Sequence, residues 1–518
     1  MISFRFCFSV RGFLLGVGLG LLSACGKKAN ACHDVGIKPS TSLLPPSTPS
    51  GLGNTPSPLR AFAWQTPVYE TPSTTARILG YVRAGARVET TAGPALAASG
   101  CEGAWQAVLP KGFLCIAPGS ASNDPRQETL RTLDDAAPTT ENVLPYLYGI
   151  VRRPGPIYGR LPTRAQAETT EPGLAERVLA WAALDGEDGA SFRAELWLRP
   201  PSANPVSSAR ELWEKHINVD VPWFFAGGRQ PPPIGGSPKR DEGLIAGAMQ
   251  RHHGFAFTRT FVAEGRRYAV TPDLLLLPVD RLRAIAGSPY KGVEIPGDVA
   301  MPLALVRVEG AFAFRMVGRR LVRDRALPRR TALPLTGKQQ FFDGHLYFES
   351  TDGTWVSETH ASRLDPAKRM PKWGKEGGHW LDINVTKQTL VAYDGTRPVF
   401  ATLVSTGEAG LGDPATTKAT KRGIFRIHTK HVTATMASEE VGEAFELRDI
   451  PYVQYFDAGY ALHAAYWHDD FGRPRSHGCI NLAPADARRL FFWTDPPLPP
   501  GWHTVREPLR GSVVFVHP

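Results

Sequence analysis

The residues with the clearest capacity for chemistry lie in one stretch near the C-terminus, residues 461–482. His463 is followed sixteen positions later by Cys479, which stands in the string S-H-G-C-I-N at 476–481. Only a few per cent of an ordinary cysteine is thiolate at neutral pH, and an adjacent imidazole that accepts the proton raises that fraction. A glycine before the cysteine permits a sharp turn whose backbone N–H groups point at one oxyanion. The pattern predicts a cysteine nucleophile with a histidine base.

The same string resembles the signature of the L,D-transpeptidase (YkuD-type) catalytic domain: a His, a spacer, then Ser/Thr-His-Gly-Cys-hydrophobic-Asn. Its positions are filled here by His463, Ser476, His477, Gly478, Cys479, Ile480 and Asn481. The similarity extends back to about Trp380 and covers the last quarter of the chain. It implies a β-sandwich-like catalytic domain, placed at 379–507, that acts on peptidoglycan stem peptides and needs no cofactor.

The resemblance also implies roles for individual residues. Cys479 would attack a peptide carbonyl and form a thioester acyl-enzyme. His463 would act as general base and then as acid, with its ring oriented by the carbonyl of Ala464. The family assigns His477 and Gly478 mainly to the oxyanion hole and the shape of the loop. On an extended backbone His477 shares a face with the nucleophile, so it remains a rival base.

Six residues in or near the motif are candidates for binding the substrate: Ser476, Asn481, Arg473, Arg475, Tyr452 and Tyr455. The serine and the asparagine are expected to hold the loop by side-chain hydrogen bonds. The arginines could pair with stem-peptide carboxylates or remain solvated. The tyrosines could line a groove or fill a core. The spacer residues 468–470 are interpreted as an exposed polar loop, and no metal site is predicted.

Composition indicates a folded protein of several domains. With 518 residues the chain is too long for one ordinary core. Its content of 42% hydrophobic and 21% charged residues is typical of a folded protein. Glycine and proline, 51 and 46 residues, favour turns and short strands. The net charge of +10 comes from scattered lysines and arginines without a nucleic-acid motif, so we expect no nucleic-acid partner. Nothing in the sequence assigns an oligomeric state.

The N-terminus predicts export and lipidation. Arg5 and Arg11 precede an apolar run, 13–22, which leads into Leu-Ser-Ala-Cys at 22–25. That ending resembles a bacterial lipobox, which implies a signal peptide over 1–25, a lipidated Cys25 and a lipid anchor in a membrane of the cell envelope, with the folded part in the periplasm. An ordinary cleaved signal peptide is the alternative. The Pro/Ser-rich residues 26–58 are interpreted as a tether.

The other cysteines fit an oxidising compartment. Cys101 and Cys115 are fourteen positions apart and are predicted to form a disulfide that stabilises the fold by ~3 kcal/mol. Cys32 is left without an assigned partner.

Between the tether and the catalytic domain the sequence predicts three regions. Residues 59–120 consist of short alternating runs that resemble bacterial SH3-like domains, and residues 301–366 repeat that layout, which indicates a second β-rich region. Residues 121–300 are expected to be α+β, and their role is not assigned. The predicted fold class is therefore mainly β.

The resemblance implies formation of 3→3 cross-links in peptidoglycan with release of D-alanine. The same acyl-enzyme could pass its acyl group to water, as in an L,D-carboxypeptidase, or to the lysine of a lipoprotein. A non-catalytic wall-binding lipoprotein is the alternative from another class.

Overall fold

The computed structural model describes residues 58–97, 99–124, 128–177, 220–238, 241, 243–367, 369–438 and 445–518. Strands make up 43% of the structure and helices 9%, so the mainly β fold class is confirmed. The predicted signal peptide, Cys25 and Cys32 lie outside these residues. Within them, no helix has the length and apolar character needed to cross a membrane.

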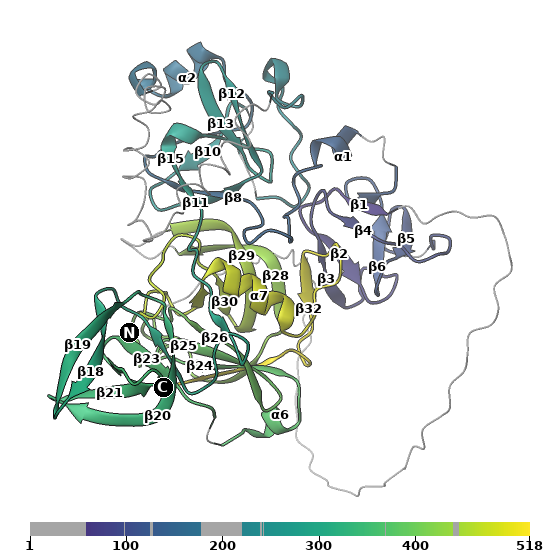
Figure 1. Ribbon diagram of the computed structural model, residues 1–518. Coiled ribbons are helices and arrows are strands. Elements are labelled where there is room, and N and C mark those ends of the chain that lie inside the picture. Colours follow the sequence, from purple (N-terminus) through teal and green to yellow (C-terminus); the bar gives the residue numbers. More distant parts are fainter. Residues whose placement is uncertain are drawn as a thin grey trace, which may run out of the picture.

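The C-terminal domain is a sandwich of two sheets (Figure 1). One sheet has six strands, in the order β16 (Val293–Glu294), β26 (Arg397–Leu403), β25 (Thr389–Asp394), β24 (His379–Asn384), β33 (Val513–His517) and β27 (Gly423–Arg426). The strands that face it are β28 (Thr429–Ser438), β29 (Phe445–Asp457), β30 (Tyr460–Ala464) and β31 (Ile480–Leu482).

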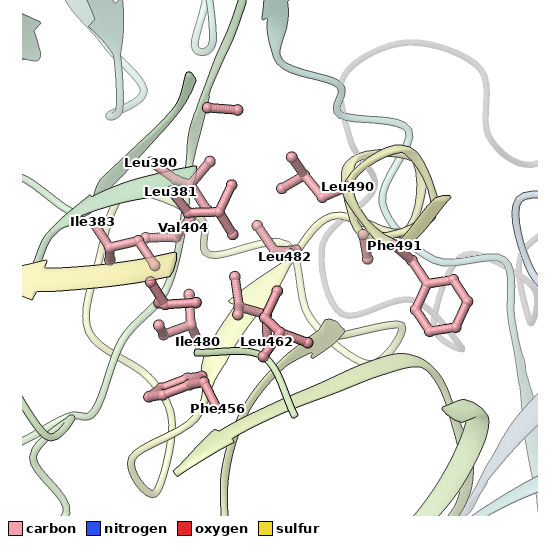
Figure 2. Close-up of a cluster of buried hydrophobic side chains, with 14 of the residues drawn as sticks. Leu381, Ile383, Leu390, Val404, Phe456, Leu462, Ile480, Leu482, Leu490 and Phe491 are labelled. Atoms are coloured by element: carbon pink, nitrogen blue, oxygen red, sulfur yellow. The ribbon is translucent and has the colours of Figure 1, made fainter. Parts of the chain in front are cut away.

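The core between these layers follows from alternation along the strands. Leu381 and Ile383 of β24 point inward because residues two apart share a face of a strand. They meet the side chains of β30, β31 and helix α7 (Pro484–Trp493), including Leu490, as Figure 2 shows. Proline stands in the first turn of α7, where its missing N–H costs no hydrogen bond.

The catalytic domain extends beyond the predicted end at 507. Strand β33 pairs in parallel with β24 and antiparallel with β27, which places residues 513–517 inside the six-stranded sheet. Its buried valines, Val514 and Val516, belong to the core of the sandwich. The limit predicted at 507 falls short of β33 because a turn at 507–512 separates these last apolar residues from β32.

The N-terminal β domain is built from two small sheets around a shared core. One contains β4 (Arg87–Val88), β1 (Leu59–Ala61) and β7 (Ala121–Ser122), and the other β3 (Ile78–Val82), β2 (Thr66–Tyr69), β6 (Phe113–Ile116) and β5 (Ala104–Ala107). Cys101 and Cys115 form the disulfide that their spacing predicts. Strand β3 pairs with β32 (Thr504–Arg506), which in turn pairs with β28, so this domain continues a sheet of the catalytic domain.

The described part of residues 121–300 is mostly strands, together with the short helices α1 (Glu128–Thr132) and α2 (Arg164–Thr170). Five strands form one sheet: β10 (Ile245–Met249), β9 (Gly155–Tyr158), β14 (Leu276–Pro278), β13 (Arg266–Val270) and β12 (Arg259–Ala263). Three more, β15 (Leu282–Ile285), β8 (Leu147–Val151) and β11 (Gly254–Phe257), join the catalytic sheet through the pairing of β11 with β29.

Residues 301–366 form a single seven-stranded sheet with its own core, as the prediction of a β-rich region requires. Its order is β19 (Arg320–Leu327), β18 (Ala311–Val317), β22 (Trp355–Ser357), β21 (His345–Ser350), β20 (Ala332–Phe342), β17 (Leu303–Val306) and β23 (Ala361–Leu364). Helix α6 (Lys372–Lys375) lies in the linker to the catalytic domain. The seven-stranded sheet touches the active-site spacer, because Arg329 donates a hydrogen bond to the carbonyl of Asp469 at 2.6 Å.

A buried ion network stabilises the middle region. The Glu171 carboxylate, 3% exposed, accepts hydrogen bonds from Arg266 at 2.6 and 3.0 Å, from Arg281 at 2.6 Å and from the hydroxyl of Tyr158 at 2.6 Å. Burial alone would raise the pKa of Glu171, but the bonds and charge of Arg266, with those of its other partners, outweigh it and lower the pKa to about 2.

We expect Glu171→Ala to lower the free energy of unfolding by ~3–5 kcal/mol, because it removes the carboxylate that binds the buried guanidinium groups of Arg266 and Arg281 and leaves Asp280 to pair with both. Urea denaturation measures the effect, and Glu168→Ala, which removes an exposed partner of Arg164, is the matched control with an expected loss under ~0.5 kcal/mol. The pKa of Glu171 is lower in the folded than in the unfolded protein. Its ionisation therefore contributes fully to the free energy of unfolding above about pH 4.5, and this contribution is lost as the pH falls through about 2. Equal effects of the two substitutions would refute this account.

Candidate active site

The pairing of β30 with β31 brings His463 and Cys479 together. The strands run parallel, with Leu462 opposite Ile480 and His463 opposite Asn481. Cys479 immediately precedes the first residue of β31, Ile480. Continuing the same register by one residue places Cys479 beside Ala461 of β30. Because residues two apart share a face of a strand, the imidazole and the sulfur project from the same side of two neighbouring strands.

The His463 ring is held in one tautomer. Its Nδ1–H donates a hydrogen bond to the carbonyl of Ala464 at 3.2 Å, so the proton of the neutral ring is on Nδ1 and Nε2 is a free base. The indole of Trp467 stacks on the ring, with 5.8 Å between centroids. Burial lowers the pKa of His463 to about 4, and the bond to Ala464 only partly opposes this effect. His463 is therefore neutral at pH 7, the state in which it can accept a proton.

The thiol of Cys479 is also neutral at rest. It packs against an apolar cluster that includes Ala461, Tyr455 and Trp467, and its Sγ donates a weak hydrogen bond to the carbonyl of Gly459 at 3.7 Å. Burial raises the pKa of the Cys479 thiol to about 11, against a smaller lowering by the backbone of Ala461. An adjacent imidazole was expected to raise the ionised fraction of the thiol; in the structure, desolvation instead favours the uncharged pair of Cys479 and His463.

Ser476 ties the nucleophile turn together. Its hydroxyl accepts a hydrogen bond from the Gly478 N–H at 3.1 Å and donates one to the carbonyl of Cys479. The Gly478 N–H is thereby occupied within the loop, so its predicted part in the oxyanion hole does not fit this structure. The backbone N–H of Cys479, in the same turn, is a further candidate for the oxyanion hole. Ser476 is 6% exposed and holds the loop by side-chain hydrogen bonds, as expected from the sequence, and this burial does not favour its other assignment as a substrate-binding residue.

Gly478 is required by geometry. Its φ is +124°, and a Cβ at this position would lie 2.9 Å from the Tyr460 ring. We expect Gly478→Ala to lower the rate of Cys479 acylation by about ten- to a hundredfold, because the turn must shift to relieve strain of ~1–2 kcal/mol. Acylation is measured by intact mass. Gly353→Ala is the matched control, since φ is +81° there with open space around it, and an equal loss of acylation in that variant would refute the argument.

Asn481 and His468 form a buried pair beneath the turn. The Asn481 amide lies 2.9 Å from His468 Nε2, and His468 Nδ1 accepts a hydrogen bond from the N–H of Asp470 at 3.2 Å. Burial lowers the pKa of His468 to about 3, so the ring is neutral. His468 is 6% exposed, which corrects the interpretation of 468–470 as an exposed loop; Asn481, 2% exposed, supports the loop rather than contacting substrate.

The two predicted tyrosines have different positions. Tyr452 is fully buried under α7, and its hydroxyl donates to the carbonyl of Asn142 at 2.7 Å, so its prediction as a substrate-binding residue is wrong. Tyr455 is half-buried in the cluster around Cys479. The ring of Tyr460 packs against Gly478, and its hydroxyl donates a hydrogen bond to the carbonyl of Pro414 at 3.3 Å.

The charged and aromatic neighbours of the turn are more exposed. Arg473 and Arg475 are both exposed, and Arg475 pairs with Asp470 at 3.4 Å. His477 is half-buried and lies against the Phe445 ring, 5.3 Å between centroids. In the part of the chain that the structure describes, no three His, Cys, Asp or Glu side chains gather as a metal site would require.

Comparison with known proteins agrees with this geometry. Residues 378–515 match the model of the YkuD family, the L,D-transpeptidase catalytic domain. Residues 378–515 form a YkuD domain. The match covers the strands from β24 to β32, which include both strands of the site, and the first three residues of β33; it starts one residue before the predicted limit at 379. No curated protein matches the sequence.

Solved structures similar to parts of the chain carry the same description. An L,D-transpeptidase from Stackebrandtia nassauensis is 27% identical over 29% of this chain and 58% of its own, with a TM-score of 0.20. The catalytic domain of an E. faecium L,D-transpeptidase is 21% identical over 27% of this chain and 98% of its own, with a TM-score of 0.21. The L,D-transpeptidase from Xylanimonas cellulosilytica is 21% identical over 30% of this chain and 64% of its own, with a TM-score of 0.20. The chain thus spans less than two thirds of two of these structures, and at such TM-scores the family match alone assigns the YkuD domain.

Proposed function

We propose that this protein is a peptidoglycan L,D-transpeptidase that forms 3→3 cross-links through a thioester on Cys479. The observation that carries the proposal is the register of β30 and β31, which sets a neutral imidazole with a free Nε2 on the same face as the sulfur. The match of residues 378–515 to the YkuD family supports the reaction class.

The reaction would proceed in two steps. In the first, Cys479 Sγ bonds to the carbonyl carbon of the third stem residue while His463 Nε2 takes the thiol proton; the C–N bond then breaks, and the imidazolium gives the proton to the leaving D-alanine amine. In the second, the amine of another stem peptide attacks the thioester and releases the thiol. The backbone N–H of Cys479 would stabilise the oxyanion, a contribution of ~3 kcal/mol for one donor.

Because both partners are uncharged at rest, proton transfer is expected to accompany attack on the substrate rather than precede it. A bound peptide brings a carbonyl whose developing negative charge makes transfer to His463 favourable. Arg473 and Arg475, exposed beside the turn, are proposed to attract stem-peptide carboxylates. The Leu-Ser-Ala-Cys ending at Cys25 supports a lipid-anchored protein that works in the periplasm.

The products test the proposal. Purified protein incubated with disaccharide-tetrapeptides should give cross-linked dimers and free D-alanine, read by mass spectrometry. Tripeptides without dimers would assign an L,D-carboxypeptidase instead, and transfer to an added lipoprotein lysine would assign attachment. No change in the substrate would leave only the wall-binding alternative.

The base assignment has its own test. His463→Ala is expected to lower the acylation rate by ~10²–10⁴-fold through loss of the general base. His477→Ala should have a smaller effect, and His345→Ala, at an exposed histidine of the seven-stranded sheet, is the control that should change nothing. If acylation survives in His463→Ala but is lost in His477→Ala, then His477 is the general base and the assignment of His463 is wrong.

A further inference from the structure

The hairpin formed by β18 and β19 carries exposed apolar and basic side chains at its tip. Val317 and Val322 are 59% and 50% exposed, although both are large hydrophobic residues. The pairing of Arg315 with Val322 and of Val317 with Arg320 places these four side chains on one face of the hairpin. Four exposed arginines surround the tip: Arg315, Arg319, Arg320 and Arg323.

The tip lies beyond the core of its own sheet. Ala311 and Ala313, at the start of β18, are buried in that core, whereas Arg315 and Val317, which continue the same face, are exposed. Strand β19 is the edge of the seven-stranded sheet and pairs with β18 alone among the described strands. Figure 1 shows the hairpin at the outer edge of the molecule. The two valines therefore face outward, where a partner can reach them.

The tip is strongly basic. Residues 315–325 contain five arginines against one aspartate, a formal charge of +4. That aspartate, Asp324, pairs with Arg315 at 3.0 Å. Within the described ranges of the chain, neither Arg319 nor Arg320 lies within ion-pair distance of a carboxylate. Uncompensated charge of one sign on a projecting element favours an anionic partner.

Charged side chains on an edge strand have a second possible role, since they protect the strand from pairing with another chain. This role accounts for arginines along β19. It does not account for Val317 and Val322, because exposed aliphatic side chains at the same edge favour such pairing. Apolar and basic side chains side by side on a projecting tip instead indicate an interaction surface.

The surface of a lipid bilayer accepts both kinds of side chain at once. Aliphatic side chains enter the boundary between headgroups and acyl chains, while guanidinium groups remain at the level of the phosphates. Each arginine close to an anionic bilayer strengthens binding roughly fivefold. A hydrated anionic polymer would attract the arginines equally but would leave Val317 and Val322 in water, so the valines favour the bilayer.

We propose that the β18–β19 hairpin docks on the surface of a bilayer that contains anionic phospholipid, with Val317 and Val322 in the interface and Arg319 and Arg320 at the phosphates. This docking does not depend on acyl transfer. The lipid anchor and tether predicted from the sequence would keep the hairpin close to such a surface. Because the seven-stranded sheet contacts the active-site spacer, docking would also orient the active site relative to the bilayer.

The test uses the chain from residue 26 onward, which keeps every described residue and lacks both Cys25 and the apolar run 13–22. Co-sedimentation with phosphatidylcholine vesicles should show clear binding when the vesicles contain phosphatidylglycerol and much weaker binding when they do not. Raised salt should weaken the binding, because it screens the arginines from the headgroups. Failure to bind the anionic vesicles at low salt would overturn the proposal.

Two double variants separate the contribution of charge from that of apolar contact. Arg319→Glu with Arg320→Glu should weaken binding to the anionic vesicles at least ~tenfold. Val317→Ser with Val322→Ser should weaken it at least ~threefold, because the interface then buries less apolar surface. Unchanged binding of the valine variant would show attraction to a polyanion in general and would overturn docking on a bilayer. Binding to purified peptidoglycan that only the arginine variant loses would assign that polymer as the partner instead.

Matched controls come from other exposed positions. Lys372→Glu with Lys375→Glu reverses two exposed charges on α6, and Phe341→Ser removes a ring that is 71% exposed. Phe341 lies near the β20–β21 turn. Strands β18 and β21 run in the same direction, since each pairs antiparallel with β22, so this turn is at the opposite end of the sheet from the hairpin tip.

Both controls should bind the anionic vesicles as the parent does, and weakening equal to that of the hairpin variants would overturn the proposal. Circular dichroism of each variant separates loss of binding from loss of fold. Acylation of Cys479 by a carbapenem, expected to be unchanged in the hairpin variants, reports on the proposed function separately, so failure of either proposal is distinguished from failure of the other.

Discussion

Replacing Cys479 with alanine is expected to lower the rate of D-alanine release by at least ~10⁴-fold, because no other group in the site can form the covalent intermediate. The serine beside it, Ser476, has its hydroxyl engaged with the Gly478 N–H and the Cys479 carbonyl, so it cannot take over. Release of D-alanine from disaccharide-tetrapeptide, followed by mass, measures the loss.

The same substitution should leave the fold intact. The thiol is half-buried and makes one weak hydrogen bond, to Gly459 at 3.7 Å, so we expect a loss of stability below ~1 kcal/mol. Cys479→Ser, which keeps the size of the side chain, is the matched control, and it should be equally inactive because a neutral hydroxyl is the weaker nucleophile. Substantial D-alanine release by either variant would contradict a cysteine mechanism.

Alkylation of Cys479 by iodoacetamide should be slow at neutral pH and should rise about tenfold per pH unit up to about pH 11. With a pKa of about 11, roughly 0.01% of the thiol is ionised at pH 7, against roughly 3% for an ordinary cysteine of pKa ~8.5. The expected rate in the folded protein is thus ~10²-fold below that of the urea-unfolded chain. Peptide mapping restricts the measurement to Cys479.

The His463→Ala variant serves as the control for this profile. If the resting pair is neutral, removal of the imidazole leaves the pH dependence of alkylation nearly unchanged. A midpoint below pH 8.5 in the parent that moves upward in His463→Ala would instead show a thiolate–imidazolium pair at rest, and the account of proton transfer given above would be wrong.

The pairing of His463 with Cys479 as base and nucleophile was predicted from the residue types and the family signature, and the parallel pair of β30 and β31 places both side chains on one face. Mainly β content and the Cys101–Cys115 disulfide were likewise predictable from short alternating runs and from cysteine spacing. These features depend on local sequence.

Features that depend on tertiary burial were not predictable. Nothing in the sequence distinguishes Tyr452, which α7 covers, from Tyr455 beside the nucleophile. His468 lies in a polar string and gave no sign that Asn481 would bond to it in the interior. The neutral state of the thiol has the same origin, since the apolar cluster around Cys479 draws on strands far apart in the chain.

The pairing of separate regions into one sheet was also missed. Edges of β3 and β11 meet strands of the catalytic domain, and a composition-based boundary cannot reveal such long-range pairing. As a result, the contact of the N-terminal β domain with the catalytic domain was not anticipated from sequence.

Peptide mapping by mass spectrometry after brief incubation with disaccharide-tetrapeptide at pH 7 tests the central claim most directly. The account predicts an acyl adduct, equal to the substrate minus D-alanine, on the peptide that contains Cys479, removed by neutral hydroxylamine as a thioester is and absent from His463→Ala at the same time point. An adduct on another residue, or product formation without any adduct on Cys479 at any time sampled, would contradict it.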